Sequence, residues 1–269
     1  MDHSHHADTA APLLRDGHRI FFEIQGNGPP VTLIHGVGTW SDDWLDVIDR
    51  FGGRFRTLRY DLRSHGRSGK PPGDYAAADF VDDLAFLLDH VGIEKTHLAG
   101  SSLGGLIAQA FALAHPDRVE RLALISTVAG RTPEERERVM GRLDYIRNEP
   151  PASYFEASST RWFTDEFRAA HAELLAAKKK VIARMDTDRY AACYRVLAES
   201  DFADDLHRIK NHTLVMTGEF DQGSNPRMAR LMHDRMSGSE LIILPHLRHS
   251  LLLEAPDIVG GILREFFTG

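Results

Sequence analysis

Ser102 lies in a run of residues that could supply a nucleophile. The run Leu98–Gly105 begins with apolar residues, passes through a turn of small residues and continues into a second apolar segment. Its Gly-x-Ser-x-Gly pattern, from Gly100 to Gly104, is typical of a nucleophile elbow, a strand-to-helix turn that exposes the serine hydroxyl near a helix N-terminus. We expect a strained backbone at the serine and glycine on both sides, because side chains there would collide with the neighbouring strand and helix. The run predicts a catalytic serine.

A serine hydroxyl is a poor nucleophile at neutral pH, so Ser102 needs a base within hydrogen-bond reach and an acid that orients the base. Chains with this elbow place the acid after the serine and the histidine last. Asp221 follows a strand-like segment, at the end where ligands of a parallel sheet converge. It is the predicted acid, and Glu219 is the alternative, with a solvated turn carboxylate as its other interpretation. Residues 127–130, which follow the preceding strand, include no carboxylate, so the acid cannot come from the end of that strand.

Two histidines follow the last strand-like segment, in the loop 245–250. His249 lies further from the strand end and can reach over the sheet toward Ser102, so it is the predicted base. His246 remains the alternative, with a surface position in the loop as its other interpretation.

An oxyanion formed during attack by Ser102 needs hydrogen-bond donors. The backbone N–H of Leu103, at the head of the helix after the serine, is one predicted donor. The loop after the strand that ends at His35 should supply the second, which makes the N–H of Val37 the predicted partner. We expect His35 itself to be a structural hydrogen-bonding group.

The elements that must position these groups alternate between strand-like and helix-like segments, which predicts a parallel sheet with crossover helices. The segments are strands at 19–24, 31–35, 56–60, 96–99, 121–126, 212–216 and 240–244 and helices at 79–88, 106–111 and 258–267. From about 131 to 206 the sequence is helical and dense in charge, which predicts a helical cap. The predicted organisation is an α/β core in two parts, 13–130 and 207–269, with the cap at 131–206 and a disordered tail at 1–12.

These motifs resemble those of the α/β-hydrolase superfamily, in particular its capped branch with 3-oxoadipate enol-lactonases and C–C bond (meta-cleavage product) hydrolases. The resemblance covers nearly everything after residue 12 and is carried by five motifs: His35–Gly38, Tyr60–Ser68 (similar to D-x-R-G-x-G-x-S), the elbow, Gly218–Asp221 and the final histidine. It implies an α/β-hydrolase fold, and it favours Asp221 because the aspartate of such a Gly-x-x-Asp turn is the acid in these families.

Two positions depart from the pattern of the family. Arg248 stands where a glycine usually precedes the last histidine, and Ser250 stands where the C–C bond hydrolases usually have a tryptophan. The second departure counts against C–C cleavage.

Composition limits the partners of the chain. The net charge is −7, without a basic stripe, which argues against nucleic acid. No apolar run has the roughly 20 residues of a membrane span. Cys193 is the single cysteine, so no internal disulfide is expected and a cytoplasmic location is predicted. Apart from the histidine-rich tail, no cluster has metal-ligand spacing, so neither metal nor cofactor is expected.

The predicted cap determines the expected substrate. Arg147, Arg161 and Arg168 lie near Trp162 in the sequence and could bind a substrate carboxylate, whereas residues 178–180 are expected to form an exposed lysine-rich helix turn. The predicted function is therefore hydrolysis of an ester, lactone or amide of a small carboxylate-bearing molecule, in aromatic or heterocycle degradation. The alternatives are a C–C bond hydrolase or lyase and a ligand sensor with a slow triad. A homodimer is left open.

Overall fold

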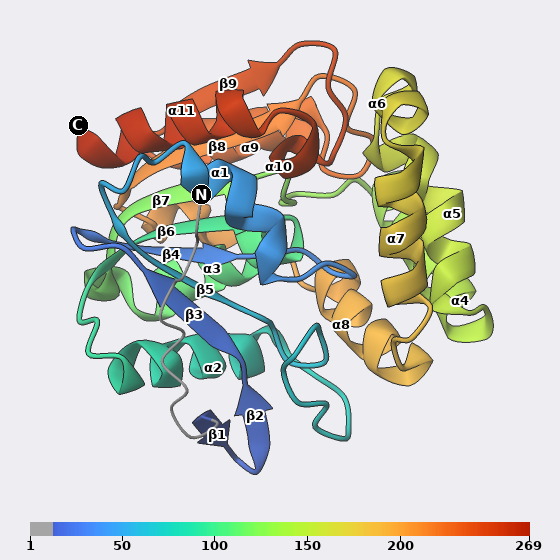
Figure 1. The fold of residues 1–269 in the computed structure, drawn as a ribbon. Coiled ribbons are helices and arrows are strands. Elements are labelled where there is room, and N and C mark those ends of the chain that lie inside the picture. The colour runs from blue at the N-terminus through green and yellow to red at the C-terminus, as the bar shows by residue number, and fades with distance from the viewer. Residues whose placement is uncertain (1–12) are drawn as a thin grey trace.

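The computed structural model describes residues 13–269, and a seven-stranded sheet forms its centre (Figure 1). The strand order is β3-β5-β4-β6-β7-β8-β9, with β3 antiparallel to β5 and all other neighbours parallel. The strands are β3 (Phe22–Gln25), β4 (Pro30–Ile34), β5 (Arg56–Tyr60), β6 (Thr96–Ser101), β7 (Val119–Ile125), β8 (His212–Gly218) and β9 (Glu240–Leu244), and a hairpin of β1 (Leu13–Arg15) and β2 (His18–Ile20) precedes them. The predicted mostly parallel sheet is confirmed.

Different helices cover the two faces of this sheet. Successive strand residues point to opposite faces, and in β4 Leu33 and Ile34 accordingly belong to two separate apolar clusters. The cluster with Leu33 lies under α1 (Leu45–Asp49), α10 (Leu251–Glu254) and α11 (Pro256–Thr268). The cluster with Ile34 lies under α2 (Ala77–His90), α3 (Leu103–Ala114) and α9 (Pro226–Arg235). Helices and apolar clusters therefore cover both faces of the sheet.

Between β7 and β8 the chain forms five further α-helices, which we call the helical insertion (Figure 1). They are α4 (Pro133–Asn148), α5 (Pro151–Trp162), α6 (Asp165–Ala170), α7 (Ala172–Ile182) and α8 (Thr187–Glu199). Helix α8 contacts both α4 and α3, so the insertion packs onto the core beside the serine elbow. Short 3-10 helices span Ser41–Trp44, Pro116–Arg118 and Ala203–Arg208.

The strand predicted at 19–24 is divided into β2 and β3. The break falls at Phe21, whose N–H donates to Ser68 Oγ over 2.9 Å and whose carbonyl accepts from the N–H of Asp61 over 2.9 Å. These contacts from a loop distant in sequence redirect the backbone. The predicted tail, residues 1–12, lies outside the described residues.

Within residues 13–269, no helix combines the length and the apolar character needed to cross a membrane. In the same range, no group of three histidine, cysteine, aspartate or glutamate side chains is arranged to bind a metal ion.

Candidate active site

Ser102 forms the turn between β6 and α3, with φ 55° and ψ −115°. This is the strained conformation predicted for the elbow. A Cβ atom on Gly100 would lie 2.2 Å from the carbonyl oxygen of Gly104, and one on Gly104 would lie 2.2 Å from the carbonyl oxygen of Ile34. Both glycines are therefore required by the backbone approach of strand and helix, as the sequence predicted.

Asp221 and His249 are joined by a hydrogen bond of 2.7 Å between Oδ2 and Nδ1. The second carboxylate oxygen, Oδ1, accepts from the backbone N–H of Gly223 at 2.8 Å and of Ser224 at 2.9 Å. Burial raises the pKa of the Asp221 carboxyl, but the His249 ring and the two N–H donors outweigh burial and hold this pKa below its usual range. Asp221 is therefore an ionised, buried acceptor.

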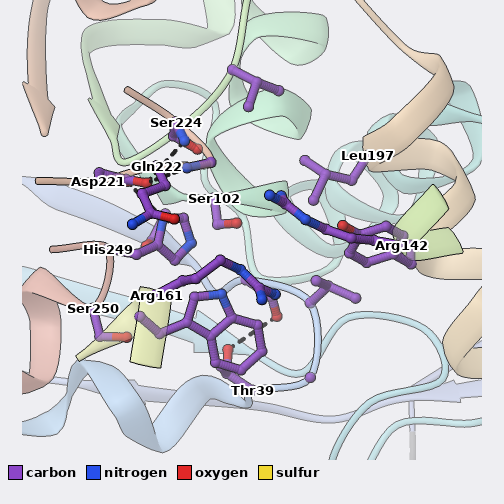
Figure 2. Close-up of a pocket in the computed structure, with 18 of the residues that line it drawn as sticks. Thr39, Ser102, Arg142, Arg161, Leu197, Asp221, Gln222, Ser224, His249 and Ser250 are labelled. Atoms are coloured by element: carbon purple, nitrogen blue, oxygen red, sulfur yellow. Dashed lines mark hydrogen bonds and ion pairs between the residues drawn. The ribbon is translucent and has the colours of Figure 1, made fainter. Parts of the chain in front are cut away.

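This pairing sets the tautomer of His249. An ionised carboxylate can only accept, so the Nδ1 of His249 carries the ring proton and Nε2 presents a lone pair. Neither Nε2 nor Ser102 Oγ has a hydrogen-bond partner in the described part of the chain. Both residues line one pocket, and Figure 2 shows them together with Asp221 around the same end of it. A free base and a free hydroxyl thus face one cavity.

The two alternatives from the sequence, Glu219 and His246, lie elsewhere. Both are exposed, and the Glu219 carboxylate accepts from the backbone N–H of His246 at 2.9 Å. Neither residue belongs to the lining of the pocket. The structure therefore pairs Asp221 with His249 at the pocket and Glu219 with His246 on the surface.

Two buried histidines form hydrogen bonds at the loop that carries Val37. His35 Nε2 accepts from the N–H of Leu62 at 2.9 Å, and His65 Nε2 accepts from the N–H of Gly38 at 3.0 Å. Burial lowers the pKa of both rings, that of His65 to about 3, so both remain neutral. His35 is thus a structural hydrogen-bonding group, as expected.

The N–H groups of Val37 and Leu103 have no acceptor within residues 13–269, and Gly36 packs against Ser102 so closely that a Cβ there would lie 3.2 Å from its Cβ. Two backbone N–H donors without an acceptor therefore lie in the segments next to the serine, Leu103 directly after it and Val37 directly after Gly36.

The helical insertion contributes cations to the same pocket. Arg161 and Trp162 line it, and so does Arg142 of α4, which the sequence analysis did not select. In Figure 2 Arg142 enters the pocket from the side opposite Asp221, and Arg161 enters beside His249. Arg161 donates to Ala157 O at 3.0 Å and to Ser158 Oγ at 2.5 Å. Arg142 has neither a hydrogen bond nor an ion pair to any described residue, so its guanidinium is available to a ligand.

Arg147 and Arg168 do not line the pocket. Each pairs with an aspartate on its own helix, Arg147 with Asp144 at 3.6 Å and Arg168 with Asp165 at 3.1 Å. Five residues along an α-helix correspond to about 140° of rotation, so Arg147 points away from the side that Arg142 occupies. Proximity to Trp162 in the sequence therefore selected Arg161 correctly but was the wrong signal for Arg147 and Arg168, for which the helix face would have been the useful one.

Lys178 is buried, and the expectation of an exposed lysine turn at 178–180 is wrong for this residue. Its ammonium pairs with the buried Asp43 and lies 4.5 Å from the ring centre of Trp40. Burial raises the pKa of the Asp43 carboxyl, and Lys178 counteracts only part of this effect. Lys178 and Ile182, one turn apart, lie on the α7 face that lines the pocket. The ion pair therefore joins the insertion to the core at the pocket wall.

Comparison with known proteins identifies one family. A model of the alpha/beta hydrolase fold matches residues 29–256. The (E)-2-((N-methylformamido)methylene)succinate hydrolase of Acinetobacter baylyi is 30% identical over 247 residues, which are 91% of this chain and 92% of that protein.

Solved structures give the same result. The enol-lactonase of Burkholderia xenovorans LB400 is similar with a TM-score of 0.88 and 28% identity, over 94% of this chain and 98% of that one. A thermophilic esterase from Thermogutta terrifontis, solved with malate bound, is similar with a TM-score of 0.85 and 30% identity, over 96% of both chains.

Proposed function

Because this chain belongs to the alpha/beta hydrolase family, we propose that it cleaves an ester, lactone or amide bond of a small carboxylate-bearing substrate with Ser102, His249 and Asp221 as its catalytic triad. The family resemblance noted from the motifs is confirmed by these comparisons, and the chain is a hydrolase. The observation that carries the proposal is the Asp221–His249 hydrogen bond of 2.7 Å beside the strained Ser102, in one pocket.

The first half of the reaction acylates the serine. His249 Nε2 takes the proton of Ser102 Oγ, which attacks the carbonyl carbon of the substrate. The negative charge moves to the carbonyl oxygen, where the N–H groups of Val37 and Leu103 donate hydrogen bonds. One such donor typically contributes about 3 kcal/mol to the transition state. The tetrahedral intermediate collapses as His249 returns the proton to the leaving oxygen or nitrogen.

The second half releases the acid. A water molecule loses a proton to His249 Nε2 and attacks the acyl carbon, and the C–O bond to Ser102 then breaks as His249 protonates the serine oxygen. Asp221 stays ionised throughout and stabilises the imidazolium that forms in each half. Its low pKa and its two backbone N–H donors suit this role, because they keep the carboxylate charged and oriented.

The proposed substrate carries a carboxylate because Arg142 and Arg161 reach into the pocket from the helical insertion. A guanidinium binds a carboxylate through two parallel hydrogen bonds. The names of relatives support this class, since one acts on a succinate derivative and another was solved with malate, and both succinate and malate are dicarboxylates. The proposed carboxylate clamp therefore keeps Arg161 from the sequence analysis and adds Arg142, and the position of both residues in the pocket lining supports it.

The test of the substrate class compares acids with their neutral methyl esters, over a panel of small lactones, esters and N-acyl enamines with a C–C meta-cleavage product included. A charge-assisted contact contributes about 1.5–3 kcal/mol, so kcat/KM should fall roughly tenfold to more than a hundredfold when the charge is masked. Arg142→Gln should reduce this preference, because Arg161 remains, whereas Arg147→Gln should leave it unchanged. Equal rates on acid and ester would refute the clamp, and turnover of the C–C substrate alone would replace hydrolysis of an acyl bond as the reaction.

The test of the triad uses neighbouring residues of the same type. Ser102→Ala and His249→Ala should each lower kcat by about 10⁴-fold or more, and His246→Ala should leave it within about twofold. Circular dichroism and thermal melting check that each variant is folded. A folded Ser102→Ala variant with more than a tenth of the wild-type kcat would refute the proposed function.

A further inference from the structure

Arg248, directly before His249, connects the loop of the proposed base to the helical insertion. Its Nη1 donates to the carbonyl oxygens of Thr160 at 2.6 Å and Phe163 at 2.7 Å and pairs with Asp165 Oδ1 at 3.2 Å. Thr160 lies in the last turn of α5, Phe163 is its C-terminal cap, and Asp165 begins α6. The guanidinium of Arg248, in the loop between β9 and α10, thus binds both the C-terminal end of α5 and the first residue of α6.

The contact satisfies a general need of helix ends. The last carbonyl groups of an α-helix have no partner within the helix, and the partial negative charge at this end favours a cation. The Arg248 side chain is 24% exposed, and its bond to the Phe163 carbonyl is partly buried. Arg248 therefore holds the C-terminal end of α5 in its position.

The same end of α5 holds the backbone of His249. The carbonyl oxygen of Trp162, the last residue of α5, accepts from the N–H of His249 at 3.1 Å and of Ser250 at 2.9 Å. The indole ring lies over the imidazole, with ring centres 6.5 Å apart and planes at 29°. On the other side, a Cβ on Gly218 would lie 2.1 Å from the carbonyl oxygen of Arg248, so the loop rests directly on the end of β8. His249 is thus held between the sheet and the insertion.

We propose that Arg248 is a positioning residue for the base: by capping α5 it fixes the Trp162 carbonyl, and through that carbonyl it sets the place of His249 in the pocket that Ser102 also lines. The inference rests on the proposed function, since it needs His249 as the base. It also explains how the loop is held in a chain that departs from the glycine usual at this position. The contacts of Arg248 and of the Trp162 carbonyl then couple the base to the helical insertion, so a movement of α5 also moves the imidazole of His249.

The experiment separates positioning from simple stabilisation. Arg248→Ala should lower kcat by about tenfold to a hundredfold with KM changed less than about threefold, because a misplaced base slows proton transfer without removing a substrate contact. Arg248→Lys, whose ammonium can reach one of the carbonyls, should recover part of kcat. The proton on His249 Nδ1, observed by NMR as a downfield resonance, should broaden in the alanine variant as the Asp221 hydrogen bond loosens.

The matched control is Arg118→Ala. Arg118 also binds two backbone carbonyls, of Glu94 at 2.7 Å and Ile93 at 2.9 Å, and its side chain is 25% exposed, but it lies outside the pocket lining. This variant should lose stability and keep kcat. Wild-type kcat in Arg248→Ala would overturn the inference, and so would a loss of kcat in Arg118→Ala equal to that in Arg248→Ala. If Arg248→Ala does not fold, Arg248→Lys takes its place. Wild-type kcat together with an unchanged Nδ1 resonance in Arg248→Lys would then overturn the inference. An active Ser102→Ala variant would instead overturn the proposed function.

Discussion

Replacing Asp221 by asparagine should reverse the tautomer of His249. In the wild type Oδ1 accepts from two backbone N–H groups, of Gly223 and Ser224, and Oδ2 accepts from His249 Nδ1. The amide oxygen of the Asp221→Asn variant must take the Oδ1 position, because an NH₂ group there would face two donors. The NH₂ group then points at Nδ1, which must accept. The ring proton moves to Nε2, which faces the pocket and can no longer take the proton of Ser102.

The expected loss is large because the variant keeps the geometry and removes the function of the base. A wrong tautomer in a triad of this kind lowers kcat by about 10⁴-fold, which corresponds to about 5.4 kcal/mol at about 1.36 kcal/mol for each factor of ten. The two side chains are nearly the same size, and Asp221 is buried, so the fold should be retained. Asp221→Ala, which imposes no tautomer, should be no worse than Asp221→Asn.

The assay is steady-state kcat on the best acidic ester or lactone, with thermal melting to check folding. Glu219→Gln is the comparison, because this carboxylate accepts from the N–H of His246 on the surface; its kcat should stay within about twofold of the wild type. A folded Asp221→Asn variant with more than a tenth of the wild-type kcat would refute the tautomer argument. So would an Asp221→Ala variant that is far less active than Asp221→Asn.

Three further predictions concern the pocket wall, the loop of Val37 and metals. Lys178→Met leaves the buried Asp43 unpaired and should lower the free energy of unfolding by about 3–5 kcal/mol in urea titrations, and adding Asp43→Leu should restore most of it; additive losses would contradict this. The pKa of His65 is about 3 in the folded protein, below its unfolded value, so its contribution to stability is complete above about pH 6.5 and is lost toward pH 3. His65→Gln should therefore reduce the fall of stability between pH 6 and 4 by about 1.4 kcal/mol per pH unit, and an unchanged slope would show that the ring is not neutral. EDTA should leave activity of the chain without residues 1–8 unchanged, and a loss restored by a divalent cation would show that a metal takes part.

The sequence alone was sufficient for the elements that depend on neighbours along the chain. The parallel strands follow from short apolar runs separated by helical patterns, and the strained turn at Ser102 follows from glycines that pack against Ile34 and against each other. These are local steric and periodic signals, so they survive without knowledge of the tertiary structure. The break of the first predicted strand at Phe21 was not accessible, because its cause is a contact with the distant Ser68.

Choices between similar side chains could be predicted from the sequence in some cases and not in others. The sequence favoured Asp221 over Glu219 and His249 over His246, and the folded loops bring Asp221 and His249 together at the pocket. Arg142 rather than Arg147 enters that pocket because the packing of α4 selects one helix face. These outcomes depend on contacts between residues far apart in sequence, and a single sequence contains no direct measure of those distances.

Lys178 illustrates the same limit most clearly. In the sequence it stands with two other lysines, which is typical of a solvated helix face, and in the structure it is buried against Asp43, 135 residues away. A lysine is buried only where an opposite charge compensates for the lost hydration. The sequence therefore determined the type of reaction that this protein can catalyse, because it supplies the serine, the histidine and the aspartate. The tertiary structure decided which of the charged side chains face the substrate and which pair with each other.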